Sequence, residues 1–330
     1  MTRGPLIFLG VLFSLACSWA ALIFGSQLQL GALEPAAILN SSELYPAPRP
    51  GLAQQGAEVY RANGCFYCHS QQVRQNGITF GAVLTDPGTN TALVIDVLVN
   101  QPQFTDLARG HNKRVHANDA LAKLPVVLVE NTSAALANQA MKPFTDIEVK
   151  TELTFKNLGA DIAAGLGPRG SVARDYLFDN PPMPGSLRLG PDLANVGSRA
   201  PEKFTAMWSF TAAARTNEVL QAAERERFHL AHLYNPAAGA KGSTMPAYPF
   251  LFEKRQLKPG AKPSSDALLL GKDAPADGLE VIPTSQARAL AAYLMSLRHD
   301  ASLVERAVPR PPRLPAPSTN AAPSAAVPKQ

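Results

Sequence analysis

The chain has 330 residues, of which 46% are hydrophobic and 17% are charged, and its formal net charge is +5. This length and composition allow two small globular domains with connecting segments and exclude a chain that is disordered throughout. The basic residues are scattered rather than gathered into a stripe, so we expect no nucleic acid partner.

The N-terminal stretch predicts a membrane anchor. Residues 5–25 carry no charged side chain and are long enough to cross the hydrocarbon core as one helix. A cleaved signal peptide is the competing interpretation, but its apolar core usually has about 7–15 residues. This run is longer and carries Trp19 and Phe24 towards its far end, where interfacial aromatic residues lie. We therefore expect an uncleaved transmembrane anchor over residues 1–27, with Cys17 as a passive buried thiol.

The charges around this helix predict its orientation. Arg3 and the N-terminal amine precede the apolar run, and the next basic residue is Arg49. Because basic residues stay on the cytoplasmic side, the start should face the cytoplasm and the remainder the opposite side. Residues 28–51 are rich in Pro and Ala and are expected to form an extended tether.

A short helix is expected over residues 54–63, directly before Cys65-Phe66-Tyr67-Cys68-His69. In such a motif, Cys65 and Cys68 can add to the two haem vinyl groups while His69 binds the iron on the proximal face. A redox dithiol would need a βαβ context and a zinc site would need a second ligand pair, and neither is visible. The motif therefore predicts one covalent haem c, attached outside the cytoplasm, in agreement with the predicted orientation.

The pattern of residues 78–157 predicts a small α/β domain, inserted after the haem-attachment motif. Strand-like runs at 78–84, 126–129 and 147–153 are interleaved with helical patterns at 91–99, 118–124 and 133–144. His111 and His116 lie in a polar, basic connector, where an exposed histidine is expected.

The segments of this insertion that suggest a known fold are Phe80 to Thr85, Gly88 to Asn90, Ala92 to Ile95, Ala122 to Leu128 and the pattern from Ala134 to Lys150. Their order resembles the C-terminal domain of the bacterial ribosomal stalk protein of the large subunit. The basic helical turn that binds translation factors in that family is replaced here by the longer stretch of residues 101–117. The resemblance thus implies the fold of a spacer or docking domain and not the ribosomal function.

Cytochrome-like sequence resumes in residues 165–300. Residues 189–197, which contain Gly190-Pro191-Asp192, look like the loop beside the proximal histidine in small c-type cytochromes. In such a loop the proline carbonyl accepts a hydrogen bond from the second imidazole nitrogen, which fixes the ring. Pro191 is the candidate for this role, and an ordinary Gly-Pro turn is the alternative.

Met245 is the candidate for the sixth iron ligand, because prolines on its C-terminal side stiffen its loop. A methionine opposite a histidine is typical of electron-carrying haem c, because the soft sulfur favours Fe(II). Met183 also lies between prolines and is a rival, whereas Met207 sits in a helical pattern and is expected in the core. His229 and His232, three residues apart, are expected to pack near the cofactor rather than to bind the iron.

The sequence after residue 252 predicts three segments: an excursion, a helix and a tail. Residues 253–283 are expected to form a surface excursion, and residues 284–298 a helix with one apolar stripe. On this helix Tyr293 and Leu297 are expected to contact Gly56 and Tyr60. Pro and Ala dominate from residue 301 onward, which predicts a disordered tail over 301–330. The chain as a whole is expected to be mainly α, with a class I cytochrome c-like domain over residues 52–77 and 165–300.

Five segments occur in the order of a known family: Cys65 to Gln71, Val73-Arg74, Gly190 to Ala194, Phe228 to Pro236 and Thr244 to Pro249. As a set, behind one N-terminal helix, they resemble the membrane-anchored mono-haem subunit of cbb3-type cytochrome c oxidases. The resemblance implies that Cys65 and Cys68 anchor the haem, His69 is the proximal ligand and Met245 the distal ligand. Gln72 and Gln75 depart from the family pattern, and so does the α/β insertion.

The resemblance implies outer-sphere electron transfer towards a haem–copper oxidase catalytic subunit, with a second haem c subunit and a soluble cytochrome c donor as further partners. It also implies a single-pass protein of the bacterial cytoplasmic membrane, with its haem domain in the periplasm. No triad, phosphate loop or paired-carboxylate site is visible, so no catalytic residue is assigned to the chain itself. A haem c subunit of a nitric oxide reductase, and a monohaem cytochrome with a sensing or assembly role, stay open as alternatives.

Overall fold

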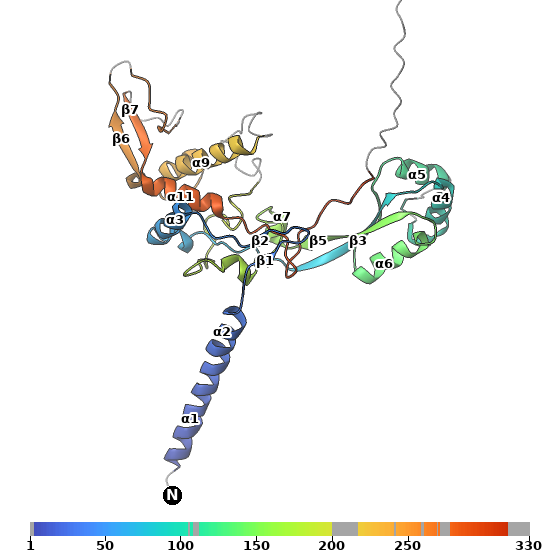
Figure 1. Cartoon of the computed structure of the whole chain (residues 1–330), viewed down its shortest axis with the longest axis horizontal. Coiled ribbons are helices and arrows are strands. Elements are labelled where there is room, and N and C mark those ends of the chain that lie inside the picture. Colours follow the sequence, from blue (N-terminus) through green and yellow to red (C-terminus); the bar gives the residue numbers. More distant parts are fainter. Residues whose placement is uncertain are drawn as a thin grey trace, which may run out of the picture. The chain divides into compact units, whose positions relative to one another are not determined.

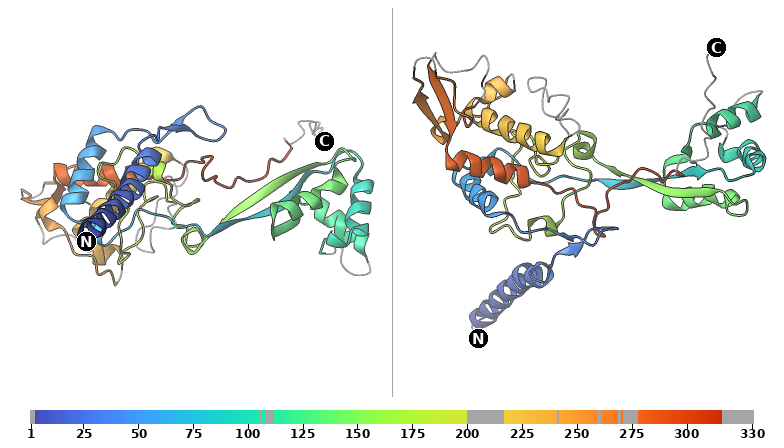
Figure 2. Two further views of the ribbon diagram at one scale, coloured as in Figure 1. Left: turned by 90° about the horizontal axis from the view of Figure 1, so that it is seen from below. Right: turned by 45° about the horizontal axis from the view of Figure 1, so that its top comes forward.

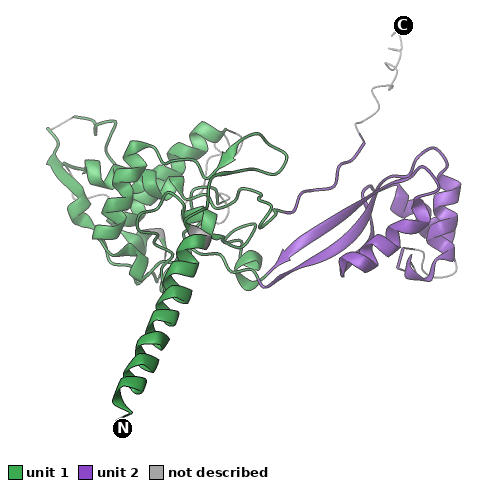
Figure 3. Cartoon of the chain, turned by 60° about the horizontal axis from the view of Figure 1, so that its bottom comes forward, with its two compact units in different colours: residues 1–75, 159–308 green, residues 76–158, 309–330 purple. Residues whose placement is uncertain are grey.

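The structure is a computed structural model that describes residues 3–104, 106–107, 112–199, 217–240, 242–258, 261–268, 270 and 278–315. The chain divides into two compact units, residues 1–75 with 159–308 and residues 76–158 with 309–330 (Figure 3). The described residues combine helices with small antiparallel sheets. The chain is therefore mixed α/β, and the expectation of a mainly α protein holds only in part.

The N-terminal helix consists of α1 (Gly4–Trp19), the π-helical turn η1 (Ala20–Phe24) and α2 (Gly25–Leu30) (Figure 1). Over Gly4–Leu28 its mean hydropathy is 2.4, and no residue of α1 or η1 is buried. Among the described residues it is the one helix that is long and apolar enough to cross a membrane. A signal sequence near the N-terminus would have the same length and hydropathy. These properties are consistent with a single-pass membrane protein.

The expected tether is bonded to the rest of the first unit. It contains the short antiparallel strands β1 (Ala36–Ala37) and β2 (Leu44–Tyr45). The Tyr45 hydroxyl donates to Asp175 Oδ1 at 2.8 Å, and Arg49 forms an ion pair with Asp179. The expected tether is therefore attached to the first unit at two points, because these two polar side chains have partners distant in sequence.

Three longer helices frame the core of the first unit: α3 (Gly51–Ala62), α9 (Glu218–Tyr234) and α11 (Ser285–Ser296). The side chain of Thr284 accepts from the backbone N–H of Ala287 and starts α11, as expected for an N-cap threonine. Short helical turns connect these elements: η2 (Cys65–Tyr67), α7 (Ala160–Ala163), η5 (Ala173–Tyr176), α10 (Pro236–Gly239) and η7 (Pro249–Leu251).

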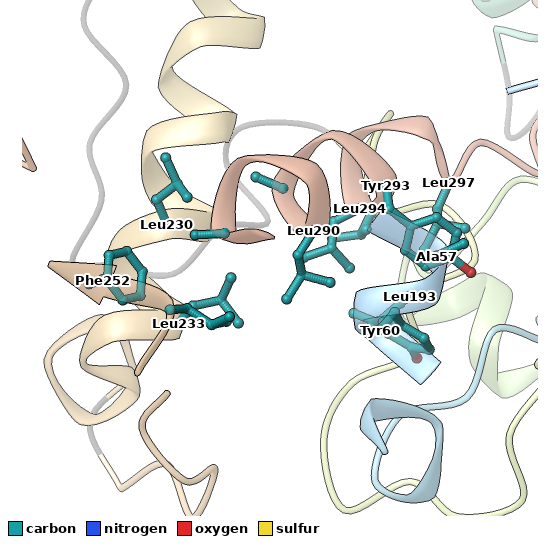
Figure 4. Packing of buried hydrophobic residues seen from close by; sticks show 14 of the residues in the cluster. Ala57, Tyr60, Leu193, Leu230, Leu233, Phe252, Leu290, Tyr293, Leu294 and Leu297 are labelled. Atoms are coloured by element: carbon teal, nitrogen blue, oxygen red, sulfur yellow. The ribbon is translucent and has the colours of Figure 1, made fainter. Parts of the chain in front are cut away.

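Helices α3 and α11 lie side by side in all views (Figures 1 and 2). A Cβ atom added to Gly56 would lie 1.8 Å from the carbonyl oxygen of Ala289, so only glycine allows this approach. The rings of Tyr60 and Tyr293 have their centroids 5.1 Å apart. Leu297 is buried in the same cluster, and Figure 4 shows the side chains of both helices meeting there. The predicted contact of Gly56 and Tyr60 with Tyr293 is confirmed.

The expected surface excursion contains an antiparallel hairpin of β6 (Phe252–Gln256) and β7 (Leu279–Pro283). Val281 and Ile282 are buried. The strand pairing inside this excursion was not predicted, because the two strands are short and are separated by a polar stretch without periodicity.

The second unit follows the order expected for the insertion: β3 (Gly77–Asp86), α4 (Thr91–Asn100), η3 (Pro102–Phe104), α5 (Lys113–Leu121), β4 (Val126–Thr132), α6 (Ala134–Met141), η4 (Lys142–Phe144) and β5 (Lys150–Leu158). The strands form one antiparallel sheet in the order β4-β3-β5. Side chains from all three α-helices join those of the sheet in one core, which includes Ala82, Leu84, Val94, Leu98, Ala117, Leu121, Leu128 and Ala137. His116 is exposed as expected, and His111 lies outside the described residues.

The segment after α11 is bonded to the protein where a disordered tail was expected. Leu303 is fully buried, and the backbone N–H of Leu39 donates to the carbonyl oxygen of Ser302 at 2.8 Å. Further on, the backbone N–H of Arg313 donates to Glu152 at 2.9 Å. A buried leucine and these hydrogen bonds outweigh the Pro- and Ala-rich composition up to residue 315, and residues 316–330 lie outside the described part.

Candidate functional site

The Cys-x-x-Cys-His motif follows α3 directly. Gly64 ends the helix with φ of +66°, a left-handed conformation that favours glycine. The backbone N–H of His69 then donates to the carbonyl oxygen of Cys65 at 3.0 Å, which closes one helical turn around both cysteines. Cys65 and Cys68 are half-buried and form no disulfide. Burial raises the pKa of the Cys65 thiol to about 11, so this side chain is a neutral thiol at neutral pH.

The imidazole of His69 is held by the loop that the sequence singled out. Its Nδ1 lies 2.9 Å from the carbonyl oxygen of Pro191. Because a carbonyl oxygen can only accept, Nδ1 carries the proton and Nε2 keeps its lone pair for a ligand contact. The predicted hydrogen bond between His69 and Pro191 is therefore present across 122 positions of sequence.

Gly190 allows this loop to lie against the face of the ring. An added Cβ would lie 2.2 Å from Cε1 and 2.7 Å from Nδ1 of His69. The backbone N–H of Gly190 also donates to the carbonyl oxygen of Cys68 at 3.0 Å. Sequence reasoning located the loop but gave Gly190 no role, although glycine before the proline was a signal for a close backbone approach.

Asp192 fastens the chain after His69 to the same loop. Its fully buried carboxylate accepts from the Ser70 hydroxyl at 2.6 Å and from the backbone N–H of Gln72 at 2.7 Å. It also accepts from the backbone N–H of Ala194 at 2.9 Å. Sequence reasoning assigned no role to Asp192, because its partners lie about 120 positions earlier.

Arg188 and Asp161 extend this network. The Arg188 guanidinium contacts both oxygens of Asp161, at 2.6 and 2.8 Å, and its Nε donates to the Ser70 hydroxyl at 2.7 Å. Asp161 also accepts from the backbone N–H of Arg74 at 2.7 Å. The hydrogen bond from Arg188 holds the pKa of Asp161 below its ordinary value. Hydrogen bonds from Asp192, Arg188 and Asp161 thus hold the residues that follow His69 against the segment that contains Pro191.

Met245 lies on a loop that is bonded to α9. The backbone N–H of Tyr248 donates to the carbonyl oxygen of Leu233 at 2.9 Å, and the backbone N–H of Met245 donates to the Ser243 hydroxyl at 3.3 Å. The half-buried Met245 side chain packs against the same core cluster as Cys65. The structure therefore brings Cys65, Cys68, His69 and Pro191 together and puts Met245 on the cluster that Cys65 borders.

Met183 belongs to that cluster as well and is 8% exposed. Its segment packs on the backbone next to the proximal histidine, since the carbonyl oxygen of Pro184 accepts from the N–H of Gln71 at 2.7 Å. A Cβ added to Gly185 would lie 2.5 Å from the carbonyl oxygen of His69. Met183 thus lies on a segment that packs against the backbone of His69 and Gln71, whereas Met245 lies on a separate loop. Met207 lies outside the described residues.

His229 and His232 lie on α9, and their expected packing near the cofactor stays a prediction. Burial, with a smaller contribution from His232, lowers the pKa of His229 to about 3. The His232 ring stacks on Phe228, with centroids 5.6 Å apart and planes 10° apart. Burial lowers the pKa of His232. The buried Nδ1 of His232 has no hydrogen-bond partner among the described residues.

Within the described part of the chain, no group of three or more His, Cys, Asp or Glu side chains lies close enough to hold a metal ion. A zinc site around Cys65 and Cys68 is therefore not formed by these residues. The donor set fits a covalently attached haem: two free thiols and, directly after them, an imidazole whose Nδ1 is bonded to a carbonyl oxygen. Comparisons with protein-family models and with curated protein sequences gave no match.

Proposed function

We propose that the chain is a membrane-anchored monohaem c-type cytochrome with a class I cytochrome c fold, and that it is the electron-entry subunit of a cbb3-type haem–copper oxidase. The observation that carries the first part is the oriented imidazole of His69, bonded to the Pro191 carbonyl directly after two free cysteines. The order of the sequence motifs from residue 65 to residue 249 supports the oxidase assignment.

Cys65 and Cys68 would hold the haem through thioether bonds, and His69 and Met245 would bind its iron. When bound, the haem supplies a one-electron Fe(III)/Fe(II) couple. Pro191 keeps the Nδ1 proton of His69 in a hydrogen bond, which fixes the ring and makes Nε2 a better electron donor. The soft sulfur of Met245 favours the reduced state.

The surrounding network supports a rigid site. Asp192 is fully buried and Arg188 bridges Asp161 and Ser70, so the backbone on both sides of His69 is held by hydrogen bonds to charged groups. Such bonds are stronger than neutral ones. Ligands that keep their positions in both oxidation states suit electron transfer, which requires no nucleophile or general base.

The remaining parts of the proposal concern location and partners. The N-terminal helix supports anchoring in a bacterial cytoplasmic membrane, and Arg3 before it favours a periplasmic haem domain. The partners are the catalytic oxygen-reducing subunit, a second haem c subunit and a soluble cytochrome c donor. The chain alone performs electron transfer and depends on its partners for oxygen reduction.

The test is purification of the full-length chain from its native membranes in mild detergent. Copper and b-type haem in the complex, together with oxygen consumption, are expected. Non-haem iron with nitric oxide turnover would replace the oxidase by a nitric oxide reductase. A monohaem protein without partners would leave the sensing or assembly role.

A further inference from the structure

Four charged side chains lie in the network around the segment that follows His69: the carboxylates of Asp161 and Asp192 and the guanidinium groups of Arg188 and Arg199. Asp192 is fully buried, and the side chains of Asp161 and Arg188 are 10% and 26% exposed. Arg199 is half-buried. Charges with little solvent around them act on their neighbours more strongly than exposed charges do. The balance of these four charges therefore matters for any group that binds at His69.

Asp192 carries its negative charge directly beside His69. The residue before it, Pro191, accepts the hydrogen bond from Nδ1 of the imidazole. The carboxylate itself accepts from the Ser70 hydroxyl at 2.6 Å and from the backbone N–H of Gln72 at 2.7 Å. It is therefore bonded to the residue that directly follows His69, and it cannot move away from the imidazole without the loss of these bonds.

Arg188 places a positive charge between the two carboxylates. Its guanidinium contacts both oxygens of Asp161, at 2.6 and 2.8 Å, and lies 3.6 Å from Oδ2 of Asp192. Arg199 adds a second positive charge, since it donates to the backbone carbonyl oxygen of Asp192 at 2.5 Å. Arg74 joins the network through its backbone N–H, and its side chain is exposed, so solvent screens its charge. The two carboxylates and the two guanidinium groups balance, and removal of any one would leave a net charge.

Such a net charge would act on a haem iron with a definite sign. Reduction of Fe(III) to Fe(II) adds one electron, so a nearby negative charge favours Fe(III) and a nearby positive charge favours Fe(II). The hydrogen bonds and the burial around an axial ligand tune the reduction potential in addition to the ligand itself. The group on which these charges would act is the haem proposed for Cys65, Cys68 and His69, so the inference rests on the proposed function.

We propose that Asp192 and Arg188 are positioning residues that set the reduction potential of the haem at His69 through their opposite charges. Asp192 favours the oxidised iron. Arg188 offsets this effect across the 3.6 Å contact, and its bonds to Asp161 and Ser70 hold it in that place. Both residues act through the segment around His69 and not as iron ligands.

The test is a spectroelectrochemical titration of the full-length chain at neutral pH, purified in detergent from cells that attach haem c. Arg188→Gln removes the positive charge and keeps a hydrogen-bond donor, so the reduction potential should fall. Asp192→Asn removes the negative charge at nearly the same size, so the potential should rise. Each change should alter the ratio of Fe(II) to Fe(III) at a fixed ambient potential about tenfold, which corresponds to about 59 mV. Arg188→Lys keeps the charge without the forked contact and should stay close to the unaltered chain.

Two further variants control for folding and for charge in general. If Asp192→Asn does not fold, Asp161→Asn decides the sign, because it removes the other carboxylate and should also raise the potential. Arg255→Gln removes a positive charge whose side chain is 56% exposed and should leave the potential unchanged. Haem staining of the unaltered chain separates two kinds of failure, since a chain without haem contradicts the proposed function and this proposal with it. A chain that carries haem, with potentials that do not move or that move in the same direction in Arg188→Gln and in the carboxylate variant, overturns this proposal alone.

Discussion

The imidazole of His69 is oriented by main-chain atoms of the loop that follows Arg188. The Pro191 carbonyl bonds to its Nδ1, and Gly190 lies so close that any Cβ would collide with the ring. Asp192 then binds the backbone N–H of Gln72. These contacts leave Nε2 as the one ring nitrogen of His69 that could bind the iron of the proposed haem, and a second side chain would be needed as the other iron ligand.

Met245 is predicted to be that residue. Oxidised protein should show the weak far-red charge-transfer band of an iron–methionine bond, and Met245→His should abolish the band while the haem stays attached. Met183→Leu is the matched control, because Met183 belongs to the core cluster that Met245 packs against and its replacement should leave the band in place. Loss of the band in Met183→Leu and its retention in Met245→His would assign the ligand to Met183.

The folded-state pKa of His229 is about 3, below the ordinary 6.5, because the ring is buried. Below about pH 6.5 the unfolded chain binds a proton that the folded chain does not bind until about pH 3. The stabilising contribution of neutral His229 is therefore complete above pH 6.5 and is lost as the pH falls towards 3. From pH 6.5 to pH 5 the loss should be about 2 kcal/mol.

Chemical denaturation of the unaltered chain and of His229→Phe at pH 7 and pH 5 measures this contribution. The free energy of unfolding should fall by about 2 kcal/mol more in the unaltered chain than in the variant. His116→Phe replaces an exposed histidine and should behave like the unaltered chain. Equal pH dependence in all three proteins would contradict the burial of a neutral His229.

At the scale of elements, α3 and α11 cross in the hydrophobic core of the first unit and contribute many of its buried side chains. Gly56→Ala should destabilise it by about 3 kcal/mol or more, because the new Cβ would lie 1.8 Å from the Ala289 carbonyl oxygen and the helices would have to separate. Gly51→Ala is the matched control on the same helix, since a Cβ there meets nothing within 4 Å. Thermal unfolding of both variants checks this. Similar midpoints for the two variants would show that the helices can move apart at little cost.

The crossing was predicted from the resemblance to small c-type cytochromes, in which the last helix crosses the first, and the apolar stripe of residues 284–298 indicated which face would meet α3. The β6–β7 hairpin was not, because its strands have five residues each and lie far apart in sequence. Local periodicity reports only neighbours along the chain. The same limit hid the bonds of Tyr45 and Arg49, whose carboxylate partners follow about 130 positions later.

The site shows the same division. Cys65, Cys68 and His69 were predictable because the chemistry requires them within five consecutive positions, and Pro191 was predictable from its similarity to a known loop. Gly190 and Asp192 were missed, because their roles depend on distances to His69, Ser70 and Gln72 that no single-sequence pattern contains.

At the scale of the whole molecule, the second unit interrupts the first between residues 75 and 159. Its two ends lie next to each other, since Gly77 pairs with Leu158 in the sheet and the backbone N–H of Asn76 donates to the carbonyl oxygen of Leu158 at 2.7 Å. Each unit has a hydrophobic core of its own, and such a core is what a domain requires to fold independently.

Deletion of residues 76–158, with a short Gly-Ser linker in their place, should therefore leave a folded first unit. Its unfolding midpoint should stay within a few degrees of the full chain. Purification of the deletion variant from membranes then tests the function of the insertion, where loss of partner subunits indicates a docking domain and their retention a spacer. An unfolded first unit would contradict the independence of the two units.

The central claim is a haem bonded covalently to the cysteines that precede His69. Its most direct test is haem staining and intact mass of the full-length chain after denaturing electrophoresis, together with the pyridine haemochrome spectrum, from cells that attach haem c. We expect one haem per chain with the spectrum of two thioether bonds, and no haem in the Cys65→Ala, Cys68→Ala double variant. A chain that runs without haem, or a double variant that keeps it, would contradict the account.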